Sequence, residues 1–234
     1  MRPGDPNLAL LEIVADRLGD ELREQVVFVG GAVAGLLITD PAMPAIRPTD
    51  DVDLIVEVLA LSDYHRLETG LRERGFEQDL RPQAPICRWR AGPVAVDVMP
   101  TLEHILGFSN RWYPLAIQTA LWIRLPSGKQ IRQISAPAFI ATKLEAFDGR
   151  GNGNYLFSHD LGDLLAVIDG RATVLSECRA APTELRDWLA GRFRKLLATS
   201  AFVEALPGHL PPDDASQERL PDLLESLRSL TSAD

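Results

Sequence analysis

Two acidic residues inside one apolar run constrain the fold of this chain most strongly. The run begins Asp51-Val52-Asp53 and continues with aliphatic residues, a pattern typical of a strand over residues 52–58. Because side chains alternate along a strand, Asp51 and Asp53 share one face. Adjacent carboxylates repel each other unless a cation lies between them, and Mg²⁺ prefers oxygen ligands and nucleotide phosphates. We therefore expect a cation site on this face, whereas a turn or helix cap would not explain Asp53 in the middle of a strand.

A glycine pair lies further back in the chain, and a sixteen-residue gap, residues 32–47, separates it from the segment Pro48-Thr49-Asp50-Asp51-Val52-Asp53. Gly30 and Gly31 follow a predicted strand over residues 26–29, and a helix is predicted over residues 32–38. Without side chains at this position, backbone N–H groups at a helix N-terminus can approach a triphosphate closely. A plain strand-to-helix turn is the alternative.

A third acid, Asp97, lies within an otherwise apolar strand. Residues 87–90 and 94–98 predict a hairpin, and the alternating valines place Asp97 on the face opposite to theirs. A carboxylate inside such a strand is costly unless it is paired or bound to metal. If this strand neighbours residues 52–58, Asp97 completes a three-carboxylate cluster that could hold two metal ions. An exposed acid on an edge strand is the alternative.

The remaining pattern is mixed up to about residue 135 and helical beyond it. We predict an α+β fold, a mixed β-sheet flanked by helices and followed by a helical C-terminal half, with domains at 1–135 and 136–234. Residues 207–216 resemble a linker, after which the last helix is either mobile or docked. The other predicted helices are 7–23, 62–74, 139–147, 160–168, 185–197 and 220–230, and the other predicted strands are 117–123 and 130–134.

The composition is that of an ordinary globular protein, with 46% apolar and 24% charged residues in a chain of 234. The net charge of −9 argues against nucleic-acid binding through a broad basic surface. Residues 204–234 hold seven acids and two bases, so they contribute −5 of that charge. Arginines around Trp89, with Trp112, favour a local patch on which a nucleic-acid end stacks, and a solvated basic face is the alternative.

Neither cysteines nor apolar runs suggest a secreted or membrane protein. Cys87 and Cys178 stand far apart without a metal-ligand pattern, so we expect buried reduced thiols. The longest apolar run, residues 26–38, has thirteen residues, whereas a membrane span needs about 20. The first six residues show no signal-peptide pattern. We expect a cytoplasmic protein with no membrane partner.

Together these motifs resemble the nucleotidyltransferase superfamily that includes polymerase β. Gly-Gly before Arg-x-Thr-x-Asp-x-Asp is similar to the AbiEii/AbiGii toxin-type branch, and the resemblance covers roughly residues 25–170. Its residues are Gly30-Gly31, Arg47-x-Thr49-x-Asp51-x-Asp53, Asp97, Lys143-Leu144-x-Ala146-Phe147, Arg150-Gly151 and Ser158-x-Asp160-x-x-Asp163-Leu164.

The resemblance implies a metal site and the loop that supports it. Asp51 and Asp53 would be ligands of Mg²⁺, or alternatively of Mn²⁺. Asp97 would be a third ligand or the base for the acceptor hydroxyl. Arg47 and Thr49 would support the loop that carries the ligands.

The resemblance also implies a site for a nucleoside triphosphate. Gly30 and Gly31 would cradle the β- and γ-phosphates, through main-chain contacts because glycine replaces the hydroxyl residue of many relatives. Lys143 would contact the triphosphate, although a lysine that only extends to solvent is the alternative. Asp160, in preference to Asp163, would position nucleotide or acceptor, although acids in a first helical turn also favour the helix dipole.

The implied activity is the transfer of a nucleoside monophosphate from an NTP to an acceptor. By resemblance to the toxin branch the acceptor is RNA, such as a tRNA end, with an antitoxin protein as partner. The alternatives are a nucleotidyltransferase for a small molecule such as an antibiotic, and a non-catalytic nucleotide-binding partner protein.

Overall fold

The computed structural model describes residues 5–232, which separate into two compact units. The α/β unit comprises Pro6–Val33 and Arg47–Ser135. The helical unit comprises Ala34–Ile46 together with the chain from Ala136 onward. The helical unit therefore includes residues 34–46, which the expected division into 1–135 and 136–234 had placed in the first domain.

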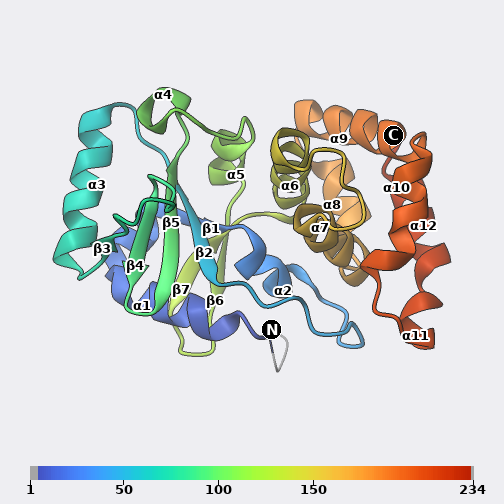
Figure 1. Cartoon of the computed structure of the whole chain (residues 1–234), viewed down its shortest axis with the longest axis horizontal. Coiled ribbons are helices and arrows are strands. Elements are labelled where there is room, and N and C mark those ends of the chain that lie inside the picture. Colours follow the sequence, from blue (N-terminus) through green and yellow to red (C-terminus); the bar gives the residue numbers. More distant parts are fainter. Residues whose placement is uncertain (1–4, 233–234) are drawn as a thin grey trace. The chain divides into compact units, whose positions relative to one another are not determined.

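The α/β unit is built on one mixed sheet, for which the described residues supply seven strands in the order β3-β4-β5-β2-β1-β7-β6 (Figure 1). Its elements are α1 (Leu8–Gln25), β1 (Val26–Val29), η1 (Gly31–Val33), β2 (Asp51–Val56), α3 (Leu61–Glu73), β3 (Glu77–Gln78), β4 (Arg88–Ala91), β5 (Val94–Pro100), α4 (Glu103–Leu106), α5 (Tyr113–Gln118), β6 (Leu121–Arg124) and β7 (Gln130–Gln133).

The strand pairing brings the acidic strands together at the centre of this sheet. β2 pairs in parallel with β5 on one side and antiparallel with β1 on the other. Helix α1 packs along the sheet against β1, β2, β5 and β7, with Leu11, Val14 and Leu18 fully buried. The apolar positions that alternate with the acids, such as Val52 and Val96, are also fully buried, which fixes the register of the strands.

The helical unit is organised around two adjacent helices, α6 and α7, which pack on each other. The acidic last helix, α12, docks on α7 and α9 through Leu223 and Leu227, both fully buried. Docking is therefore the correct alternative for this segment. The elements of the unit are α2 (Ala34–Leu37), α6 (Ala136–Arg150), α7 (His159–Gly170), α8 (Val174–Ala180), α9 (Thr183–Leu197), α10 (Ser200–Ala205), η2 (Leu206–His209), α11 (Asp214–Gln217) and α12 (Leu220–Ser229) (Figure 1).

The predicted fold class is confirmed: the chain is α+β, with a mixed sheet flanked by helices and a helical C-terminal half. The predicted strand over residues 117–123 was wrong in its first part, because Ile117 and Gln118 end α5 and the strand begins at Leu121. Arg150 is the last residue of α6. Within the described residues, no helix combines the length and the apolar character that a membrane span requires.

Candidate functional site

The structure brings the three predicted metal ligands onto adjacent strands of the α/β unit. Asp53 of β2 stands directly opposite Asp97 of β5 in the parallel register, and Asp51 lies two residues before Asp53 on the same face. β5 is an interior strand between β4 and β2, and Asp97 is only 8% exposed. The alternative of an exposed acid on an edge strand is therefore wrong.

Arg88, one of the arginines around Trp89 that were expected in a basic patch, holds two of these carboxylates. Arg88 of β4 is the cross-strand partner of Asp97 in the antiparallel register. Its Nη2 donates to Asp97 Oδ2 at 2.7 Å and to Asp51 Oδ2 at 2.8 Å, and its Nε donates to Asp97 Oδ1 at 2.7 Å. The hydrogen bond to Asp97 is the main reason that the pKa of Arg88 is raised, so the guanidinium is charged.

Gly30 fits this site because a side chain at its position would collide with Asp53. Its φ of +71° lies in the left-handed region that glycine adopts without strain. A Cβ placed on Gly30 would lie 1.8 Å from Asp53 Oδ2 and 2.7 Å from Asp53 Cβ. The strand-to-η1 turn at Gly30-Gly31 therefore packs directly against an acid of the cluster, which a plain connecting turn does not require.

A buried asparagine, which sequence reasoning missed, anchors the loop that leads to the acids. Asn7, fully buried, accepts a hydrogen bond from the backbone N–H of Thr49 at 2.9 Å and donates to the carbonyl of Arg47 at 3.2 Å. Thr49 Oγ1 in turn donates to Asp51 Oδ1 at 2.9 Å. Thr49 and the Arg47 backbone therefore do support the acidic strand, while the side chain of Arg47 is exposed.

The donor set suits a hard divalent cation, and Arg88 shows where the carboxylates converge. One guanidinium nitrogen contacts both Asp51 and Asp97, so these two acids already share a single cationic group. Carboxylate oxygens are the ligands that Mg²⁺ prefers, although at shorter distances of about 2.0–2.1 Å. Within the described residues, no group of three or more His, Cys, Asp or Glu side chains is already arranged to hold a metal ion.

Two buried groups, Cys87 and Tyr64, also lie close to the acids. The Cys87 thiol is buried and reduced, and burial, with the charge of Asp97, raises its pKa to about 12. Tyr64 of α3 is also buried, which raises its pKa, and donates to the Val98 carbonyl at 2.9 Å. Cys178, in α8 of the helical unit, is also a buried free thiol, as expected. A carboxylate cluster beside such groups interacts more strongly with cations than it would in open water.

The other predicted site residues form a second charge cluster, within the helical unit. Lys143 of α6 donates from Nζ to Asp160 Oδ1 at 3.1 Å and to Asp163 Oδ2 at 2.7 Å, both on α7. The lysine side chain is only 9% exposed, so the alternative in which it extends to solvent is wrong. Both acids are buried, and α7 therefore has no solvent-facing acidic face.

Arg150 completes this cluster from the end of α6. Its Nε and Nη2 donate to the two oxygens of Asp160, each at 2.9 Å, while the arginine side chain stays 72% exposed. Burial alone would raise the pKa of Asp160, but the hydrogen bonds from Arg150 and the charge of Lys143 outweigh it and lower the pKa. The cluster thus balances two acids with two bases and presents the Arg150 guanidinium to solvent.

The predicted stacking patch at Trp89 and Trp112 was wrong, because both rings are buried. Trp89 is completely buried and Trp112 is 4% exposed. Arginine guanidinium groups cover them, Arg72 at 5.1 Å from the Trp89 ring and Arg111 at 5.5 Å from the Trp112 ring. A base could not stack on either ring without unpacking the domain.

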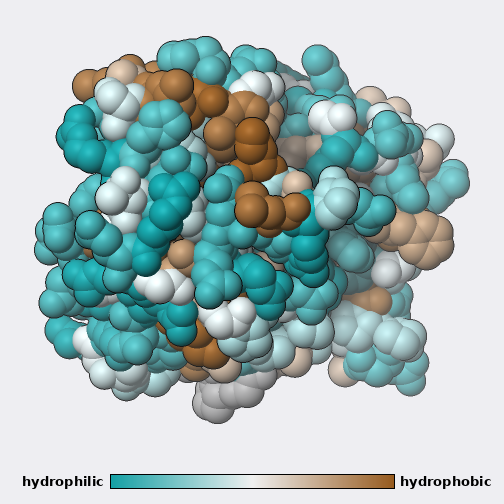
Figure 2. All heavy atoms as spheres, turned by 60° about the vertical axis from the view of Figure 1, so that its left-hand side comes forward, coloured by the Kyte–Doolittle hydropathy of each residue, from teal (hydrophilic) through white to brown (hydrophobic). Residues whose placement is uncertain are grey.

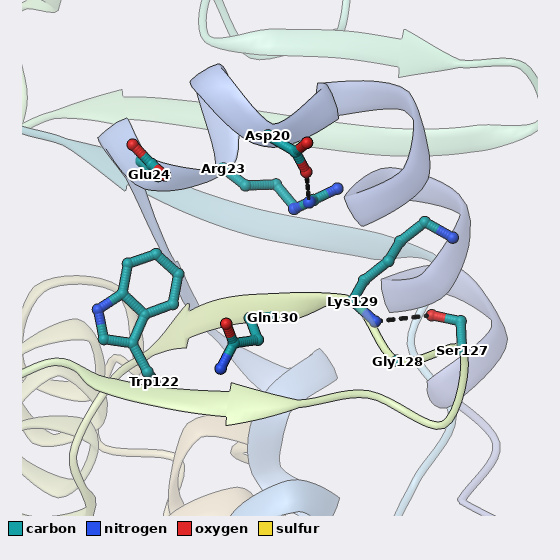
Figure 3. A pocket seen from close by; sticks show the side chains of 8 residues that line it. All are labelled: Asp20, Arg23, Glu24, Trp122, Ser127, Gly128, Lys129 and Gln130. Atoms are coloured by element: carbon teal, nitrogen blue, oxygen red, sulfur yellow. Dashed lines mark hydrogen bonds and ion pairs between the residues drawn. The ribbon is translucent and has the colours of Figure 1, made fainter.

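The exposed aromatic residue Trp122 lines a separate hollow of about 760 Å³. Figure 3 shows this hollow between α1 and the β6–β7 hairpin, at the sheet edge formed by β6. Its charges balance, with Arg23 paired to Asp20 and Lys129 paired to Asp16 outside it. Its lining residues, which include no predicted site residue, are Asp20, Arg23, Glu24, Trp122, Ser127, Gly128, Lys129 and Gln130.

Apolar side chains also reach the surface in the α/β unit. Figure 2 shows a group of hydrophobic side chains that interrupts a largely hydrophilic face. The most exposed large apolar residues of the unit are Leu80 and Leu59, at 83% and 81%.

Comparisons with known proteins add no assignment to this geometry. No protein-family model matches the chain, and no curated protein matches it.

Proposed function

We propose that this chain is a metal-dependent nucleotidyltransferase that moves a nucleoside monophosphate from an NTP to an acceptor and releases pyrophosphate. One observation carries the proposal: Asp51 and Asp53 of β2 lie beside Asp97 of β5, with Gly30 packed against Asp53. Three carboxylates on one face of a sheet, next to a glycine turn that a side chain would block, form a site suited to a cation and a phosphate chain.

Asp51, Asp53 and Asp97 are the residues that would hold Mg²⁺, or Mn²⁺ in its place. When bound, the ion would neutralise phosphate charge and make the acceptor hydroxyl more acidic. Asp97, buried and in contact with a cation, is placed either to bind metal or to take the proton of that hydroxyl. The Gly30-Gly31 turn would offer main-chain N–H groups to the phosphates.

Lys143 and Asp160 enter the proposal through the resemblance. A triphosphate contact requires the Lys143 ammonium to give up at least one of its two carboxylate partners. Asp160 would then be positioned by Arg150, whose exposed guanidinium is itself suited to a phosphate or to an RNA backbone.

RNA, such as a tRNA end, is the acceptor that the resemblance favours, with an antitoxin protein as partner and a cytoplasmic location. A small-molecule acceptor, such as an antibiotic, is the second candidate, and a specific observation favours it. Because Trp89 and Trp112 are buried, the expected stacking surface for a nucleic-acid end does not form. The net charge of −9 also suits a small cationic acceptor.

The proposal is tested by incubating the full chain with each α-labelled NTP, MgCl₂ and either total tRNA or a panel of aminoglycosides and lincosamides. We expect label on RNA, abolished by EDTA. Label on an antibiotic and none on RNA would select the second candidate. Nucleotide binding without transfer to any acceptor would contradict the enzyme proposal and favour a non-catalytic nucleotide-binding protein.

A further inference from the structure

Arg88 occupies the position where the carboxylates of the candidate metal site converge. Its Nη2 lies within 2.8 Å of oxygens on both Asp51 and Asp97, and its Nε takes the remaining oxygen of Asp97. Both oxygens of Asp97 and one of Asp51 are therefore engaged by a single side chain. A metal ion cannot bind those same oxygens at about 2 Å while the guanidinium holds them.

The negative charge of the three neighbouring acids favours a cation at the position that the Arg88 guanidinium occupies. Asp51, Asp53 and Asp97 lie on neighbouring positions of two strands, and their mutual repulsion is reduced by the guanidinium. Arg88 is anchored by register, since it stands opposite Asp97 in the β4–β5 pairing, so its location does not depend on a flexible loop.

The arginine also has room to leave. Its side chain is 23% exposed, between Asp97 at 12% and Asp51 at 31%, so the guanidinium reaches solvent at this site. The residues that precede it along the chain, from Arg81 to Ile86, are largely exposed. A long side chain with several rotatable bonds can therefore move outward while the acids stay in the sheet.

We propose that Arg88 is an internal competitor for the metal ion: it holds Asp51 and Asp97 in the metal-free protein and is displaced when a divalent cation binds. This inference rests on the proposed function, because it assumes that these acids bind metal. Displacement releases a guanidinium at the edge of the site, where a planar, bidentate donor suits the phosphates of an incoming nucleotide.

The test is the affinity of the full chain for Mn²⁺ without nucleotide, measured by the electron paramagnetic resonance signal of free Mn²⁺. Arg88→Gln removes the competing charge and should bind Mn²⁺ at least tenfold more tightly than the wild type. Arg90→Gln is the matched control: it lies two residues along β4, is also half-buried, and donates to the carbonyls of Gly92 and Pro93. Its affinity should equal that of the wild type.

A second measurement does not depend on the affinity. Without metal, Arg88→Gln should melt at a lower temperature than the wild type because the acids repel each other, and saturating Mn²⁺ should abolish most of that difference. Arg88→Lys keeps the positive charge but not the paired donors of the guanidinium. Its melting temperature should lie between those of the wild type and Arg88→Gln, and it replaces Arg88→Gln in both measurements if that variant does not fold.

The outcomes separate this inference from the proposed function. Equal or weaker Mn²⁺ binding by Arg88→Gln, or by Arg88→Lys if only that variant folds, would overturn the competitor role while leaving the metal site intact. Failure of both the wild type and the arginine variants to bind Mn²⁺ would overturn the metal site and the inference with it.

Discussion

Substitution of Gly30 by alanine tests the packing of the glycine turn against Asp53. The change has two costs. First, the φ of +71° forces alanine into the left-handed region, which costs roughly 1–2 kcal/mol. Second, the new Cβ would lie 1.8 Å from Asp53 Oδ2 and 2.6 Å from its Cγ, so the side chain and the neighbouring backbone must move, for about 1–3 kcal/mol more.

Gly107→Ala is the matched control, because Gly107 has a φ of +83° and an added Cβ would meet nothing within 4 Å. We expect Gly107→Ala to lose about 1–2 kcal/mol of unfolding free energy in urea denaturation, and Gly30→Ala to lose about 2–5 kcal/mol. Only Gly30→Ala should also weaken Mn²⁺ binding, since it displaces a ligand. Equal losses of stability in the two variants, with unchanged Mn²⁺ binding in Gly30→Ala, would refute this reasoning.

Three further predictions concern the supports of the two clusters. Asn7→Ala leaves the Thr49 N–H and the Arg47 carbonyl without their side-chain partner. It should therefore lower the free energy of unfolding in urea by about 1–3 kcal/mol and speed proteolysis near residue 47. Wild-type values for both measurements would contradict the role of Asn7 as an anchor. Lys143→Met removes a cation from between two buried acids and should cost about 3–5 kcal/mol; near-normal stability with lost NTP binding would instead favour a phosphate contact. The lowered pKa of Asp160 contributes stability that is present above the unfolded value near 3.8 and is lost as the pH falls through the folded value. The wild type should therefore lose its stability advantage over Asp160→Asn progressively as the pH falls below the unfolded value, and an advantage that is constant with pH would rule this out.

Much of the α/β unit could be predicted because its strands are short, apolar and clearly ended. The predicted strand over residues 26–29 matches β1, and the predicted hairpin of 87–90 and 94–98 corresponds to β4 and β5, of which β5 continues to Pro100. The apolar run over residues 117–123 was misread because periodicity alone does not separate a short buried helix from a strand. Pro114 at the start of α5 was a signal for helix that the pattern had contained.

The contact of Arg88 with Asp97 was also predictable from the turn between their strands. Gly92 and Pro93 form the turn between the paired residues Ala91 and Val94, and counting back along both strands places Arg88 opposite Asp97. Asn7 left no comparable signal. It lies 42 residues before Thr49, and only the folded chain brings the two together.

The assignment of residues 34–46 to the helical unit depends on contacts with distant segments. Asp40 receives a hydrogen bond from Arg219, 179 residues further along the chain, and the N–H groups of Thr39 and Asp40 donate to the carbonyl of Gly170. Local propensity cannot report such pairings, because the partners have no sequence pattern in common. The burial of Trp89 was also missed, because an aromatic residue among arginines has the same sequence pattern in a core as on a surface.

The central claim is that Asp53 belongs to a metal-dependent transfer site, and the most direct test compares two neighbouring acids. Asp50→Asn changes an exposed acid just before β2, whereas Asp53→Asn changes the acid that packs against Gly30. With α-labelled NTP, MgCl₂ and the acceptor that the wild type labels, we predict that Asp50→Asn retains transfer. Asp53→Asn should lower the rate of transfer at least a hundredfold, with an unchanged circular dichroism spectrum. Transfer by folded Asp53→Asn at the wild-type rate would contradict the account.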